Sequence, residues 1–105
     1  MSTDYSNMSD FEINKCVAKI YGGFALTLAV HNEPPSGKSF DPGRFDPCNN
    51  PADAWHIITS NRIGIVPGTA TDKWAAHHGD WDIAIADVNP LRAAMIVFLM
   101  MQEEK

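Results

Sequence analysis

The chain has 105 residues, of which 45% are hydrophobic, and this is the size of one domain with a workable core. We therefore expect a single domain over residues 1–105. The formal net charge of −5 and a pI near 5.1 argue against direct binding of nucleic acid, which needs clustered lysines and arginines. No apolar run reaches the roughly 20 residues that cross a bilayer, so we expect no membrane contact.

The N-terminal residues are polar and lack the positively charged start and apolar segment of a secretory signal. We expect residues 1–8 to form a loose lead-in and the protein to be cytoplasmic. In that reducing compartment both cysteines, Cys16 and Cys48, would be free thiols.

The first helix is predicted from a capping box at Ser9–Glu12, in which serine and glutamate satisfy each other's backbone N–H groups. Apolar residues then recur at helical spacing as far as Tyr21, and Gly22–Gly23 favours a left-handed stop. The next segment, Phe24–Val30, alternates large apolar residues with smaller ones. This alternation predicts a strand with one buried face.

Residues 31–50 are rich in proline, glycine and other turn formers, so they predict a long loop. Loops of this length are uncommon inside compact domains and often functional. Asn50 and Pro51 then favour the start of a second helix over residues 51–61. Asp53 would lie at the positive end of its dipole.

Short antiparallel strands are predicted after this helix. A strand at residues 63–66 would end at Pro67–Gly68, and residues 73–77 would be its hairpin partner. Residues 78–80 form a turn, and residues 81–86 form either a further strand or an irregular run. The predicted order is α-β-α-β-β-(β)-α, an α+β fold in which helices pack on a small antiparallel sheet.

The last helix has the clearest start, with Asn89 as N-cap and Pro90 at its first position. Residues 93–101 are apolar on all sides, so more than one face must be covered. Either the helix is central, between a sheet and other helices, or its second face is a subunit interface. The second explanation predicts a homo-oligomer, most simply a dimer.

Catalytic and metal-binding patterns are weak. His77 and His78 could ligate a metal, but consecutive strand residues point to opposite faces, which favours a solvated turn and no metal site. Cys48 with His56 or His77 is the only pair suited to nucleophilic catalysis, and nothing nearby activates the thiol. We therefore favour a protein that is not an enzyme. The sequence contains no glycine-rich phosphate loop or dinucleotide fingerprint, so no cofactor is expected.

A ligand site can still be assembled from the remaining polar and aromatic residues. A planar anionic ligand could stack on Trp74 while Arg62 and Arg92 bind a phosphate bidentately. Backbone N–H groups at helix starts also favour anions. The predicted ligand-binding residues are Trp74, Arg62, Arg92, Asn50, Asp53 and Asn89.

Two structural alternatives compete with this site. Arg92 could pair with Asp87 or Glu12 and serve only the fold. For Trp55, helical periodicity with Ile58 favours packing in the core.

Much of the chain resembles the NinX family of lambda-like bacteriophages, most specifically through its two Asn-Pro helix starts with Trp55 between them. The stretches that carry the resemblance are Met8–Lys15, Cys48–Trp55, Asn61–Ile65, Trp74–Ala76 and Asn89–Met95. The resemblance implies a small accessory protein, encoded beside phage recombination and late-regulation genes, without transferable catalytic residues.

Together these observations predict a non-enzymatic phage accessory protein in the cytoplasm of the bacterial host. It would bind and sequester either a small anionic nucleotide-like ligand or a host factor. The alternative is a protein–protein adaptor that inhibits a host defence or recombination enzyme, with the acidic, proline-rich loop at residues 31–50 as its contact.

Overall fold

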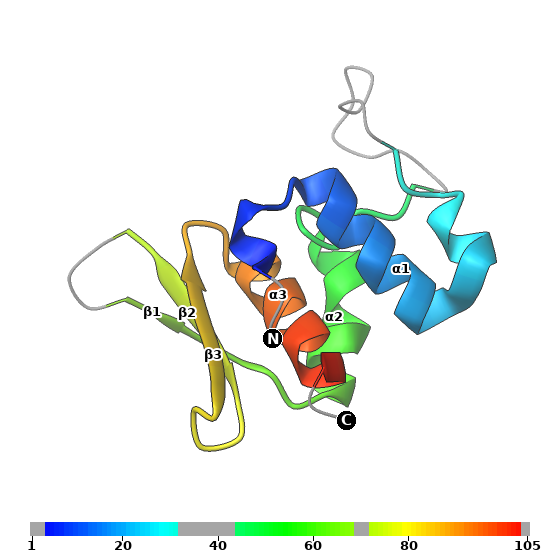
Figure 1. The fold of residues 1–105 in the computed structure, drawn as a ribbon. Coiled ribbons are helices and arrows are strands. Elements are labelled where there is room, and N and C mark those ends of the chain that lie inside the picture. The colour runs from blue at the N-terminus through cyan, green and yellow to red at the C-terminus, as the bar shows by residue number, and fades with distance from the viewer. Residues whose placement is uncertain (1–3, 32–43, 69–71, 104–105) are drawn as a thin grey trace.

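The computed structural model describes residues 4–31, 44–68 and 72–103 and arranges them in two layers (Figure 1). Within these residues, one layer is a three-stranded antiparallel sheet and the other contains three α-helices. The predicted α+β class is therefore confirmed. None of the helices in these ranges is long and apolar enough to cross a membrane.

Helix α1 (Asp10–Thr27) begins with the predicted capping box, since Ser9 accepts from the Glu12 N–H and Glu12 from the Ser9 N–H. Its buried face includes Ile13 and Val17. Just before α1, Tyr5–Asn7 form a short 3-10 turn, η1. The start of α1 thus follows the local signals in the sequence, whereas the 3-10 helix lies in residues 1–8, where a loose lead-in was expected.

The strand predicted over Phe24–Val30 is wrong, because residues 24–27 continue α1 beyond a kink. Gly23, at φ 76° and ψ −168°, leaves the helical conformation without a Cβ penalty. Leu26 then folds against Gly22, where an added Cβ would lie 2.6 Å from the Leu26 Cδ2. The glycine pair therefore bends the helix, and Figure 1 shows the chain turning at the far end of α1.

Helix α2 (Pro51–Ser60) has Asn50 as its N-cap, as predicted, and follows a tightly packed approach. In this approach, residues 44–50, the side chains of Phe45, Pro47 and Cys48 are buried. The C-terminal part of the predicted long loop therefore belongs to the core. Residues 32–43 of that loop lie outside the described residues.

The sheet consists of β1 (Gly64–Pro67), β2 (Trp74–His78) and β3 (Ile83–Asp87), with β2 in the centre. The third strand decides between the two predictions for residues 81–86. Ala76 pairs with Ile65 on one side and Ile85 on the other, so the three side chains share a face. All three belong to or pack against the hydrophobic core.

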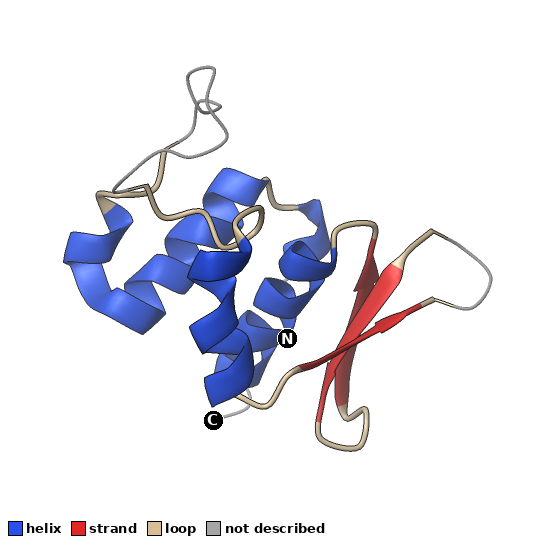
Figure 2. Ribbon diagram, turned by 180° about the vertical axis from the view of Figure 1, so that it is seen from behind, coloured by secondary structure: helices blue, strands red, loops and turns tan. Residues whose placement is uncertain are grey.

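Helix α3 (Pro90–Glu103) is the centre of the molecule. The Asn89 side-chain oxygen accepts from the Leu91 and Arg92 N–H groups at its start. Every side chain from Ala93 to Leu99 is buried. The sheet covers one side of α3, and α1 and α2 contact it from the other (Figure 2).

The structure therefore supports the first explanation for the apolar helix, a central position between a sheet and other helices. The protein's own domain covers α3, and this removes the observation that motivated a dimer. The dimer itself stays a prediction.

Candidate functional site

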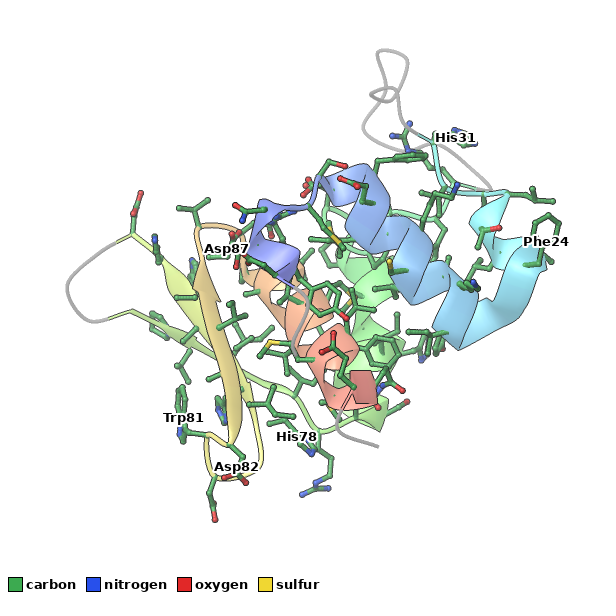
Figure 3. All side chains as sticks on the ribbon, in the orientation of Figure 1. Phe24, His31, His78, Trp81, Asp82 and Asp87 are labelled. Atoms are coloured by element: carbon green, nitrogen blue, oxygen red, sulfur yellow. The ribbon has the colours of Figure 1, made fainter. Side chains whose placement is uncertain are left out.

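The predicted ligand-binding residues do not converge on one site. Arg62 lies two residues before β1, near the end of β2, because Gly64 pairs with His77. Trp74 starts β2 at the opposite end, where it pairs with Asp87. At about 3.3 Å per strand residue, roughly 10 Å of backbone separates the two ends. Figure 3 shows the same separation, with His78 and Asp87 at opposite ends of the sheet.

Arg92 is held inside the protein and its side chain is only 12% exposed. Its guanidinium lies 2.7 Å from the Asp10 carboxylate and 3.4 Å from that of Asp87. It also donates to the carbonyl oxygens of Ser6 and Met8, at 3.1 and 2.7 Å. These four oxygens leave no free edge for a bidentate phosphate contact. Arg92 therefore serves the fold, as the structural alternative proposed. It pairs with Asp87, as expected, and with Asp10, whereas Glu12 was the other expected partner.

The three remaining predicted ligands, at the starts of α2 and α3, are also used internally. Asn50 accepts from the Ala52 N–H at 3.1 Å, and Asp53 accepts from the Asp46 N–H at 2.8 Å. Asn89 caps α3 and donates to the Cys48 carbonyl oxygen at 2.7 Å. The backbone groups that an anion would need are therefore partly satisfied by the chain itself.

Asn14 joins these hydrogen-bonded side chains, and no motif in the sequence singled it out. Its side chain donates to Asp46 at 2.7 Å and accepts from the Cys48 N–H at 3.1 Å, although the residue is only 4% exposed. The available signal was an asparagine beside Ile13 on an otherwise apolar helix face. We call the joined side chains the polar network: Asp10, Asn14, Asp46, Asn49, Asp87, Asn89 and Arg92.

The nucleophile considered from the sequence is inaccessible. Cys48 is fully buried, and this burial, reinforced by the charge of Asp10, raises the pKa of its thiol far above the usual value. A thiol that stays protonated is neither a nucleophile nor a metal ligand. Cys16 and Cys48 are both free thiols, and Cys16 is partly exposed.

The two adjacent histidines point to different surroundings, as strand geometry predicts. His77 stacks on Trp81, with ring centroids 4.0 Å apart and planes at 18°, whereas the His78 Nδ1 lies 3.1 Å from the Asn61 carbonyl oxygen. Across the ranges that the structure describes, no group of three or more His, Cys, Asp or Glu residues could hold a metal ion.

Exposed apolar side chains reveal a surface that the sequence analysis did not identify. Among the described residues, Trp55 is 62% exposed and so does not pack in the core as expected. Half of the large exposed apolar side chains lie within residues 20–28. We call these four residues the α1 tip: Ile20 at 48%, Tyr21 at 48%, Phe24 at 77% and Leu28 at 68%.

A pocket of about 350 Å³ lies beside the α1 tip. The α1 pocket is lined by residues from both sides of the Gly23 kink: Lys15, Cys16, Lys19, Phe24 and Thr27. Figure 3 places Phe24 at the outer end of the helical layer, pointing away from the core. The arrangement could not be predicted from the expected strand at residues 24–30, because that strand would place Phe24 and Leu28 on a buried face.

One family matches the chain, over residues 4–102: the family described as Bacteriophage P22, NinX. The protein belongs to the NinX family. This confirms the resemblance seen in the sequence and makes the chain a phage protein. No curated protein and no solved structure matches it.

Three of the stretches that carried the resemblance contribute side chains to the polar network: Met8–Lys15, Cys48–Trp55 and Asn89–Met95. The two Asn-Pro starts supply Asn89 and the residues around Asn50, and the Asn89–Met95 stretch includes Arg92. The α1 tip lies outside the stretches that carried the resemblance. Those stretches therefore serve the fold, whereas the family match as a whole, over residues 4–102, also spans the α1 tip.

Proposed function

We propose that this NinX-family protein is a non-enzymatic phage accessory factor that acts by binding another protein through the α1 tip. The observation that carries the proposal is the gathering of four large exposed apolar side chains within nine residues, next to the α1 pocket. Large apolar side chains that are exposed close together are typical of an interaction site, whereas isolated ones are ordinary on a protein surface.

The arrangement favours the adaptor hypothesis over sequestration of a nucleotide-like ligand. Arg62 and Trp74 lie at opposite ends of the sheet, and the guanidinium of Arg92 is already bound to four protein oxygens. The surface proposed to contact the partner is also a different one from the loop at residues 31–50. Most of the loop first considered as the adaptor surface, residues 32–43, lies outside the described residues, whereas the α1 tip is described and exposed.

The energetic argument concerns the apolar area available for burial. Covering a large apolar side chain is worth about 1.5–3 kcal/mol relative to leaving it in water. Phe24 and Leu28 are exposed by 77% and 68%, so most of that gain is still available to a partner. A host protein, such as a defence or recombination enzyme, is the class of target that a phage accessory factor would engage.

The test is crosslinking in infected host cells that produce the tagged protein. We expect a discrete host or phage protein to crosslink to the wild type and to be lost from Phe24→Asp/Leu28→Asp. Trp55→Asp is the matched control, because Trp55 is also helical and 62% exposed. Equal crosslinking of wild type and the double variant would contradict the proposal, as would a loss confined to the Trp55 variant.

A further inference from the structure

The α1 pocket combines an apolar cavity with two positive charges. Lys15 and Lys19 are exposed and lie four residues apart, so they project on the same side of α1. Among the described residues that line the pocket, none carries a carboxylate. This is a local exception on a chain whose formal net charge is −5.

The kink gives the pocket its shape. Lys15, Cys16 and Lys19 come from the helix before Gly23, and Phe24 and Thr27 come from the turn after it. A volume of about 350 Å³ lies near the lower limit of ligand pockets, roughly 300–1,000 Å³. It therefore suits one or two apolar side chains better than an extended ligand.

We propose that the α1 pocket binds an amphipathic helix of the partner protein that carries an apolar anchor and an acidic side chain one helical turn away. The anchor enters between Phe24 and Cys16, and the carboxylate pairs with Lys15 and Lys19. Recognition of a helix through apolar anchors at such spacing is a recurrent mode. This inference rests on the proposed function and specifies the chemistry of its partner.

The charge around the α1 pocket favours an acidic helix over two other occupants, a second copy of the chain and an anionic membrane. A two-fold dimer uses the same patch on both copies, so Lys15 and Lys19 would face a surface that also carries these lysines. An anionic membrane would be attracted by the lysines but repelled by the net charge of −5. An acidic helix meets the lysines and needs only a small footprint.

The test starts from selection of a randomised helical peptide library on the wild-type protein. We expect enriched peptides to share a large apolar residue with Asp or Glu three or four positions away. Their affinity should fall about tenfold on Lys15→Glu/Lys19→Glu, the scale of losing two exposed ion pairs of up to about 1 kcal/mol each. Peptides whose acid is changed to Lys should regain affinity for this charge-reversed protein.

A native thiol reports where the peptide binds. Cys16 lines the pocket and is partly exposed, whereas Cys48 is buried. Bound peptide should slow alkylation of Cys16 by iodoacetamide. Thermal melting checks that the charge-reversed protein folds, and Lys15→Gln/Lys19→Gln, which should also weaken binding, replaces it if it does not.

The outcomes separate this inference from the proposed function. Peptides that need Phe24 but carry no acid, and that bind the charge-reversed protein equally well, would overturn the inference and leave the proposed function standing. Phe24-dependent dimers in sedimentation, or Phe24-dependent binding to phosphatidylglycerol vesicles, would also overturn it in favour of a second copy or a lipid surface. Equal crosslinking of the wild type and Phe24→Asp/Leu28→Asp in infected cells would instead overturn the proposed function itself.

Discussion

Two regions of this NinX protein differ in how completely their chemical groups are satisfied. In the polar network, at the starts of α1, α2 and α3, Arg92 contacts four oxygens and Asn14 both donates and accepts. At the α1 tip, Phe24 is 77% exposed to solvent. The polar groups of the network are therefore used within the fold, whereas the apolar side chains of the α1 tip remain uncovered.

Arg92→Ala tests whether the polar network holds the fold together. If the network is the scaffold, the change leaves Asp10 and Asp87 without their cation and frees two carbonyl oxygens. We expect the free energy of unfolding to fall by about 2–4 kcal/mol, measured by urea titration. This reverses the expectation for a ligand-binding arginine, which would leave stability nearly unchanged.

Arg62→Ala is the control for this prediction. Arg62 is exposed beside the sheet, so its removal should change stability by less than about 0.5 kcal/mol. Equal stability of the two variants would show that Arg92 does not hold the fold together.

A second test uses pH to probe Cys48, whose backbone N–H and carbonyl oxygen are bound by Asn14 and Asn89 of the network. Burial raises the pKa of Cys48, so the folded thiol stays protonated where the unfolded thiol, with a pKa of about 8.5, ionises. The unfolded state then binds fewer protons, and stability is lost as pH rises above about 8.5. The slope reaches about 1.4 kcal/mol per pH unit from this group.

The measurement compares unfolding from pH 7 to 10 in the wild type and in Cys48→Ala, which should lose this part of the slope. Cys16→Ala should keep it, because Cys48 is unchanged and buried in that variant. A Cys48→Ala protein with the wild-type slope would show that the thiol titrates normally.

The smallest expected effect is at the α1 tip. Phe24→Asp/Leu28→Asp should change the free energy of unfolding by less than about 0.5 kcal/mol per site, since both side chains already face water. Thermal and urea unfolding measure this. A loss on the scale expected for Arg92→Ala would place the tip within the scaffold and remove the contrast between the two regions.

Local signals in the sequence predicted the frame of the fold and missed the relations between distant residues. Ser9, Asn50 and Asn89 were recognised as caps because a cap is satisfied within three residues. The pairing of Arg92 with Asp10 spans 82 positions of the chain, and no local pattern selects Asp10. The helix starts could therefore be predicted, but the network of hydrogen bonds between them could not.

The error at residues 24–30 has a different origin. Period-two alternation indicates a strand only where one face is buried, but Phe24 and Leu28 are exposed in a helical turn. Trp55 was misplaced for a similar reason, because its spacing to Ile58 places it near a buried helix face without requiring burial. Periodicity reports a face of an element, and packing decides whether that face is covered.

The bend at Gly23 has an evolutionary consequence. Residues before it supply the buried face at Ile13 and Val17, and residues after it place Phe24 and Leu28 in solvent. Substitutions at those two exposed positions can accumulate without disturbing the interior. Under the proposed function, the surface offered to a partner could therefore change without a compensating change in the core.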